Sequence, residues 1–235
     1  AVTGVQTGAL PISDDFAFGT GDFTVELWIR TTNLAPQYVL DNLVLGDGGT
    51  WALIINAAGD GTVGWWTGAG VGTLVASSTT TPADQGWVHI AVVRESGALG
   101  IYVNGTLETA VADVTDYTDT VPYFLIANQR GGTGVTNFDG QMDELRITKG
   151  VARYTGASFD LATLPFCNFQ GDGSGGSGDC VADEYYSCES GDPRTVLSLH
   201  AEDTEDSSCY QPKTITLLGS AVVSTDQFKF ATSSF

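Results

Sequence analysis

The residues from Gly86 to Thr109 constrain the fold most strongly. They form two apolar runs on either side of Asn104-Gly105. An Asn-Gly pair between apolar runs is the strongest short signal for a β-hairpin, because both residues of the tight turn must adopt positive φ. In the first run, 86–94, the residues at odd and at even positions are both largely apolar. This predicts a strand buried on both faces, and therefore a layered β-protein.

The rest of the first 166 residues repeats short strand patterns between glycine-rich turns. Period-two or apolar runs lie at 23–29, 100–103, 106–109, 123–127 and 141–148. No amphipathic helix is evident, although a short helical turn is expected at 149–154. A series of short strands with such turns predicts an all-β fold, a two-sheet antiparallel jelly-roll sandwich.

The chain divides by composition into three parts. Residues 1–166 form the predicted sandwich body, and 167–194 form a linker dominated by Gly, Ser, Asp and Cys. Residues 195–235 become strand-like again and end in the alternating aromatics Phe228, Phe230 and Phe235. We expect these last strands to complete a sandwich of the same or of a neighbouring subunit.

All four cysteines follow the predicted sandwich body: Cys167, Cys180, Cys188 and Cys209. An even number in a loop-rich, acidic segment favours two disulfides and an oxidising compartment. Zinc is the competing interpretation, but the sequence has no C-x-x-C pair and only His200 nearby. The connectivity is not determined by the sequence.

The net charge of −19 limits the partners of this chain. A strongly acidic surface repels phosphate backbones and anionic bilayers, which argues against binding nucleic acid. No apolar stretch reaches 18 residues, so no membrane insertion is expected. The same charge is consistent with plain solubility or with a cation-binding surface.

The sequence offers little for catalysis. Asp143 and Glu144 are adjacent, and adjacent residues of a regular strand point to opposite faces. They therefore cannot form the closely spaced carboxylate pair that glycoside hydrolysis needs. The sequence also lacks G-x-S-x-G, H-E-x-x-H and a phosphate-binding loop. We expect no enzymatic activity.

Aromatic residues are the candidates for a sugar site. Trp65 and Trp66 are adjacent, so one faces inward and the other outward, where it could stack on a sugar ring or contact another subunit. Tyr154 is a third candidate. Trp28 and Trp87 lie in apolar runs and are expected to fill the core. His89 is expected to be a hydrogen-bonded core histidine rather than a ligand or base.

Oxygen-bearing residues in predicted loops are candidates for calcium binding. Asp41, Asn42 and Asp47 flank a turn-rich segment, and Asp139 lies in another loop. Carboxylates and amide oxygens are the hard ligands that calcium prefers. Ordinary solvated turn residues would have the same pattern, since no D-x-D-x-D-G loop is present.

Three segments carry a resemblance to a known family: FGTGDFTVELWI (18–29), WVHIAVVRESGALGIYVNG (87–105) and FDGQMDELRITKGVARYT (138–155). They resemble the laminin G-like, concanavalin A-like lectin/glucanase superfamily, and especially the jelly-roll modules of bacterial surface proteins and phage structural proteins. The resemblance implies the sandwich fold and, in related lectin-like domains, calcium at one rim. It does not specify one function, because the fold serves in adhesion, sugar binding and virions.

Compared with that family, the strand order is circularly shifted. The opening strands of an ordinary member resemble residues 195–235 here, which follow the linker. These strands could fold back into their own domain, or insert into the next subunit and form a head-to-tail filament. A third alternative is one period of a tandem array.

The sequence therefore predicts a non-enzymatic structural or adhesive module that assembles head-to-tail by strand complementation. It would act outside the cell, on a cell surface or on a virion surface. The alternative is a carbohydrate-binding, lectin-like module that recognises surface glycans, with calcium as a candidate cofactor. Its partners would be copies of itself, adjacent repeats or those glycans.

Overall fold

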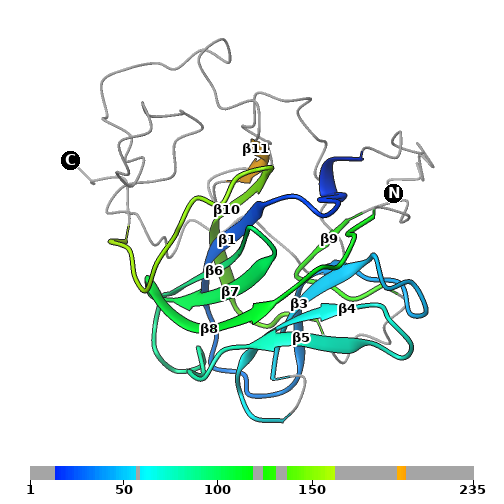
Figure 1. The fold of residues 1–235 in the computed structure, drawn as a ribbon. Coiled ribbons are helices and arrows are strands. Elements are labelled where there is room, and N and C mark those ends of the chain that lie inside the picture. Colours follow the sequence, from blue (N-terminus) through cyan, green and yellow to red (C-terminus); the bar gives the residue numbers. More distant parts are fainter. Residues whose placement is uncertain (1–13, 57–58, 119–123, 131–136, 162–194, 200–235) are drawn as a thin grey trace, which may run out of the picture.

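The computed structural model of the chain describes residues 14–56, 59–118, 124–130, 137–161 and 195–199. Its strands form two antiparallel sheets (Figure 1). The predicted all-β sandwich is confirmed. The described residues contain one short 3-10 turn, Asp14–Phe16, and no α-helix. That part of the chain accordingly holds no helix with the length and apolarity that a bilayer crossing needs.

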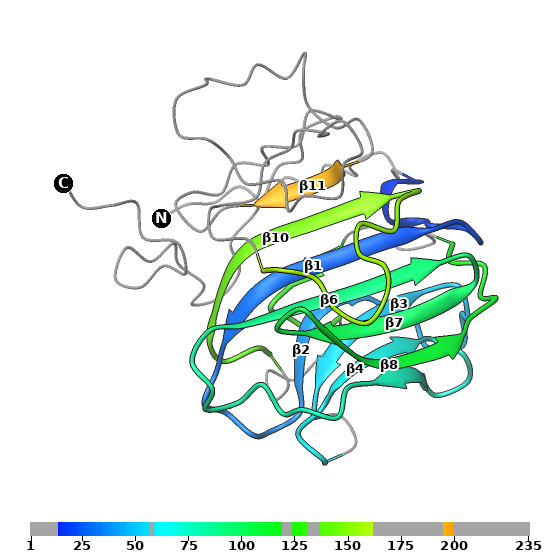
Figure 2. The ribbon, with the colours of Figure 1, turned by 60° about the vertical axis from the view of Figure 1, so that its left-hand side comes forward.

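The larger sheet has six strands, which Figure 2 shows side by side. In spatial order they are β11 (Thr195–Leu199), β10 (Gln141–Lys149), β1 (Phe23–Arg30), β6 (Val88–Glu95), β7 (Ala98–Val103) and β8 (Thr106–Ala112). The second sheet has five strands. Their order is β5 (Thr73–Ser77), β4 (Val63–Thr67), β3 (Trp51–Ile55), β2 (Gln37–Asn42) and β9 (Leu125–Ile126).

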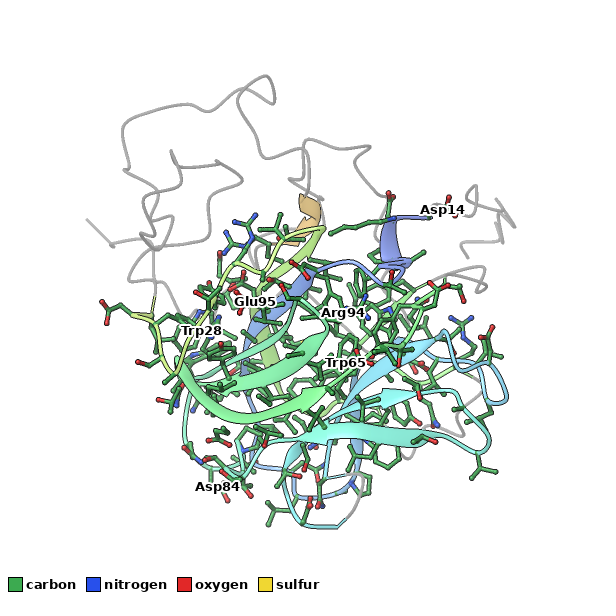
Figure 3. All side chains as sticks on the ribbon, in the orientation of Figure 1. Asp14, Trp28, Trp65, Asp84, Arg94 and Glu95 are labelled. Atoms are coloured by element: carbon green, nitrogen blue, oxygen red, sulfur yellow. The ribbon has the colours of Figure 1, made fainter. Side chains whose placement is uncertain are left out.

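The core lies between the two sheets and is rich in aromatic rings. The Trp51 and Trp65 rings stack with centroids 4.6 Å apart, and Phe23 stacks on Trp65 at 5.5 Å. Figure 3 shows Trp65 in the middle of the molecule.

The predicted two-sided burial of the 86–94 strand is also found. Val88, Ile90 and Val92 belong to this core, whereas Ala91 and Val93 join a smaller cluster on the other face.

The predicted hairpin at Asn104-Gly105 joins β7 to β8. Both turn residues have positive φ, 48° and 77°. A Cβ at Gly105 would lie 2.4 Å from the carbonyl oxygen of Phe159, so the close approach of the chain also requires glycine here. The sequence signal therefore identified the turn, but not the segment that packs on it.

That packed segment, residues 151–161, is called the strap. It crosses the outer face of the six-stranded sheet, the face turned away from the core. Thr24 Oγ1 on β1 donates to the carbonyl of Val151 and accepts the N–H of Arg153, while the Tyr102 hydroxyl on β7 donates to Gly156. The prediction of a helical turn at 149–154 is wrong, because the structure has no helix there. These bonds to the sheet take the backbone groups that a helix would pair within itself.

β11 is the described part of the segment that follows the predicted linker. It pairs antiparallel with β10 of the same chain, with Leu145 opposite Leu199 and Ile147 opposite Leu197. A strand from beyond residue 194 therefore adds to the edge of the sheet built by the body. The four cysteines and the assembly candidates Phe228, Phe230 and Phe235 lie outside the described residues, as does all of 200–235. The three-part division stays a prediction.

Candidate functional site

The outer face of the five-stranded sheet carries an aromatic surface. Its centre is a row across three strands, in which Trp66 on β4 is opposite Ala52 on β3 and Ala52 is opposite Asp41 on β2. Leu43, Ala52 and Ile54 form a small buried cluster there, against which Tyr38 and Trp66 pack while staying partly exposed. This surface, with Leu74 of β5 opposite Trp66, is called the Trp66 face.

Trp65 and Trp66 divide between the two faces of β4, as adjacent strand residues do. The Trp65 side chain is fully buried in the core, and its Nε1 donates to the Tyr117 hydroxyl at 2.9 Å. Trp65 is therefore corrected from sugar-site candidate to core residue. The hydrophobic core on one side of the strand determines which tryptophan faces outward, and Trp66 is that residue.

The Trp66 indole lies over Gly64 of its own strand. A Cβ at Gly64 would be 2.6 Å from Trp66 Nε1 and 2.9 Å from Leu74 Cδ1. Glycine thus leaves the space into which the indole and the leucine lean. Leu74 is 37% exposed, Leu45 is 63% exposed and Val71 is 92% exposed. Leu45 Cδ2 lies 3.7 Å from a Cβ built at Gly72, and Trp66 Cε3 lies 4.0 Å from it, so apolar side chains gather around the indole.

The β2 edge of the Trp66 face is polar. The buried Asp41 carboxylate accepts the backbone N–H of Leu43 at 2.8 Å and that of Arg130 at 2.5 Å. Burial raises its pKa, and these hydrogen bonds only partly offset the effect. Burial likewise raises the pKa of Tyr38, and a hydrogen bond from Gln129 only partly offsets this rise. Tyr38 was not among the residues predicted from the sequence, because the run at 37–42 does not alternate regularly. Most of its residues are buried, and the pairing of β2 with β3 shifts between Tyr38 and Leu40.

The four calcium candidates lie in different hydrogen-bonded settings. Asp47 Oδ1 accepts the N–H of Gly49 within its own turn, and Asp139 Oδ2 accepts from Asn33 Nδ2 at 3.1 Å. Asn42 is fully buried, opposite Trp51, and neither its Oδ1 nor its Nδ2 has a hydrogen-bond partner. The described residues contain no group of three or more His, Cys, Asp or Glu side chains able to hold a metal ion.

A second concentration of polar side chains lies beneath the strap. Glu26 on β1 is fully buried, and Arg146 on β10 binds its Oε1 through Nη2 at 2.7 Å and through Nε at 2.8 Å. His89 Nε2 lies 3.4 Å from Glu26 Oε2, and the Tyr154 hydroxyl donates to that oxygen at 2.6 Å. Burial alone would raise the pKa of Glu26, but the Arg146 charge, the His89 hydrogen bond and the charges of His89 and Arg153 together outweigh burial and lower the pKa to about 2.

This network fastens the strap and does not form an open site. The Tyr154 ring stacks on Phe159 at 3.6 Å, and its hydroxyl is occupied by Glu26. Burial raises the pKa of Tyr154 far above its ordinary value, and the Glu26 charge adds to the rise. Tyr154 is therefore placed as a structural link rather than on the Trp66 face.

His89 lies on the outer face of the six-stranded sheet and is nearly fully buried, as expected for a core histidine. Trp28, also buried, meets it edge-on at 5.1 Å.

The adjacent acids of β10 sit at an irregularity in the strand. The pairing with β1 shifts between Glu26 and Trp28, so that Glu26 is opposite Arg146 and Trp28 is opposite Asp143. Glu144, inside this bulge, has a φ of 52° and donates its N–H to Asp143 Oδ1. Simple alternation therefore does not hold here, because the bulge inserts an extra residue. Both side chains are buried, so the pair presents no open acid–base site.

Two antiparallel sheets that enclose one hydrophobic core define a β-sandwich. The family model of the Concanavalin A-like lectin/glucanases superfamily matches residues 4–153. The chain belongs to this family, and the resemblance seen in its sequence is confirmed. A comparison with the curated proteins gives no match.

Solved structures with a similar fold come from several organisms. One is a Bacteroides ovatus protein to which carbohydrate binding is provisionally attributed, with a TM-score of 0.57 and 20% identity over 83% of this chain and 52% of that one. This chain thus spans about half the length of that protein. The family 40 carbohydrate-binding module of a Ruminococcus gnavus sialidase, bound to α2,3-sialyllactose, gives a TM-score of 0.44 and 16% identity, covering 57% and 78%. A heptameric pentraxin from Limulus polyphemus gives 0.40 and 15%, covering 58% and 70%.

Proposed function

We propose that this chain is a non-catalytic glycan-binding module that holds its ligand on the Trp66 face. The observation that carries the proposal is the outward, partly exposed indole of Trp66 in a chain that belongs to a lectin-like family. An aromatic ring on a sheet surface offers a flat apolar platform, on which the CH groups of a sugar ring stack. Tyr38 lies on the same surface, and its hydroxyl would supply a hydrogen bond to the ligand.

The geometry also supports a binding role rather than catalysis. Glu26, Asp113 and Asp143 are buried, and Glu26 and Asp113 are paired with arginines. A glycoside hydrolase needs two carboxyl groups that reach one glycosidic bond from opposite sides. The acid beside the Trp66 face, Asp41, already accepts two backbone N–H groups, so it is poorly placed to transfer a proton.

A glycan array followed by calorimetry tests the proposal. We expect at least one glycan to bind, and Trp66→Ala to abolish that binding without unfolding the protein. The matched control is Val114→Ala, which removes an exposed apolar side chain from another segment and should bind like the parent. Binding that survives Trp66→Ala would place the site elsewhere, and silence across the array would remove the proposal.

Head-to-tail assembly is a second candidate function, because β11 pairs at the sheet edge beside β10, where a strand of a second copy could bind in its place. Backbone pairing at a sheet edge is the same whether the strand comes from its own chain or from a second copy. We therefore propose that β11 exchanges between subunits on a cell or virion surface. Light scattering after size-exclusion chromatography tests this. Multimers that disappear when 195–235 is deleted support exchange, and a protein that is monomeric at all concentrations contradicts it.

We propose calcium as a partner at the end of β2, where Asn42 is opposite the core residue Trp51 and so lies on the inner side of the sheet, away from the Trp66 face. The buried amide of Asn42 has an oxygen without a donor, and an unsatisfied buried group of this kind is unfavourable unless something binds it. Calcium titration of the chelated protein, monitored by thermal denaturation, should raise the melting temperature of the parent and not that of Asn42→Ala. No change in the parent would exclude calcium at this position.

A further inference from the structure

The sheet region around Trp66 is almost without charge. Asp60 is the only charged residue between Gly48 and Ala83, in a chain with 28 acidic and 9 basic residues. This stretch contains β3, β4 and β5, and so most of the Trp66 face. Asp60 lies in the turn between β3 and β4, where its carboxylate bonds Thr62. The rest of the chain carries nearly all of the net charge of −19.

The Trp66 indole has an unused hydrogen-bond donor at this surface. Its Nε1 is shielded from solvent and has no hydrogen-bond acceptor. Nε1 and Leu74 Cδ1 share the space above Gly64, where each lies within 3 Å of a built Cβ. A buried N–H without an acceptor is unfavourable. An oxygen that enters beside Leu74 would satisfy it, and the 37% exposure of Leu74 leaves that side chain room to move.

From these two observations we infer that the Trp66 face selects an uncharged glycan, with a sugar hydroxyl oxygen accepting the Trp66 N–H when Leu74 moves aside. The inference rests on the proposed glycan-binding function and names its ligand class. An anionic glycan would meet no cation on β3, β4 or β5. Arg130, at the β2 edge of the face, is opposed by the Asp41 charge, and the acidic remainder of the chain would repel an anion. A neutral glycan pays no such electrostatic penalty and offers both CH faces for stacking and hydroxyl oxygens for the indole.

The experiment compares neutral and anionic probes of similar length. Cello- and laminari-oligosaccharides are the neutral probes, and oligogalacturonate and sulfated oligosaccharides are the anionic ones. The readouts are calorimetry and the indole N–H signals of the isotope-labelled protein. The Trp66 signal is identified by its disappearance in Trp66→Phe. We expect a neutral probe to bind and to shift that signal, with an affinity that changes less than about twofold between low and high salt.

Two variants separate the roles of ring and donor. Trp66→Phe keeps an aromatic platform but removes the N–H, so it should bind about 2- to 10-fold more weakly, the range expected for one hydrogen bond. Leu74→Ala uncovers the N–H and should bind at least as tightly as the parent. The control Leu34→Ala removes another exposed apolar side chain and should leave the affinity unchanged.

The outcomes are distinguishable from those of the proposed function. If anionic probes bind through Trp66 and neutral ones do not, the glycan-binding function stands and the inference is overturned. It is also overturned if neutral probes bind without moving the Trp66 indole signal, or if Trp66→Phe binds as tightly as the parent. If no probe of either kind binds, the proposed function itself fails.

Discussion

Arg146 Nη2 lies 2.7 Å from Glu26 Oε1, and the two side chains are almost completely buried. They come from neighbouring strands, β10 and β1, which are 120 residues apart in the chain. Tyr154 of the strap donates to the second oxygen of the same carboxylate. One buried acid therefore joins the sheet to the segment that covers its outer face.

Removing one partner of this pair should strongly destabilise the protein. Arg146→Met leaves the Glu26 charge buried without its counterion, and we expect a loss of about 3–5 kcal/mol in the free energy of unfolding. The double variant Glu26→Gln/Arg146→Met should lose less than the sum of the two single changes, because it buries no isolated charge. Urea denaturation measures all three. Strict additivity would show that the pair is not coupled.

Stability should fall in acid because of Glu26. Its pKa is about 2 in the folded protein against an ordinary value of 4.5, so the folded state favours the ionised form. A depressed folded pKa contributes stability above the unfolded pKa, and that contribution is lost as the pH falls from about 4.5 toward about 2. The difference between the two pKa values corresponds to about 3 kcal/mol of unfolding free energy. The free energy of unfolding, measured by denaturation at several pH values in this range, should fall less steeply with falling pH in Glu26→Gln than in the parent. An unchanged pH dependence would assign the acid sensitivity to other carboxylates.

Trp65→Ala should destabilise the protein much more than Trp66→Ala, although the two residues are adjacent. Trp65 fills the core, so its truncation should cost about 3–5 kcal/mol of unfolding free energy. Trp66 is partly exposed on the outer face, so its truncation should cost far less, about 1 kcal/mol. Thermal denaturation of the two variants, alongside the glycan measurements, tests this division. Equal destabilisation would mean that Trp66 is mainly structural.

The Tyr117 hydroxyl should matter more than its ring contacts suggest. It donates to Asp113 Oδ2 at 3.0 Å and accepts from Trp65 Nε1 at 2.9 Å, all within the core. Tyr117→Phe keeps the ring but leaves the Trp65 N–H without an acceptor, so we expect a loss of about 1–3 kcal/mol. Chemical denaturation measures the loss. Tyr102→Phe, whose hydroxyl bonds a strap carbonyl nearer the surface, is the comparison and should lose less.

Local sequence patterns were sufficient to predict the sandwich because they report on burial directly. The apolar run at 86–94 and the Asn104-Gly105 turn each depend on neighbours a few residues away, and the two-sided strand and the hairpin that they predict are both found in the structure. The same patterns failed at 149–154, where hydrogen bonds to Thr24 on a distant strand hold the chain extended. They also failed at Asp143 and Glu144, because a bulge opposite β1 interrupts the alternation.

The site divides in the same way. The sequence by itself determined that one of Trp65 and Trp66 faces outward, since adjacent strand residues point to opposite sides. Only the tertiary structure decided which one, because that choice depends on the second sheet packing against Trp65. Tertiary packing also placed Tyr154 of the strap against Glu26 and brought Glu26 to Arg146, since those contacts join residues more than a hundred positions apart. The residue pattern determines which side chains share a face of a strand, and packing between strands and sheets determines which residues each face contacts.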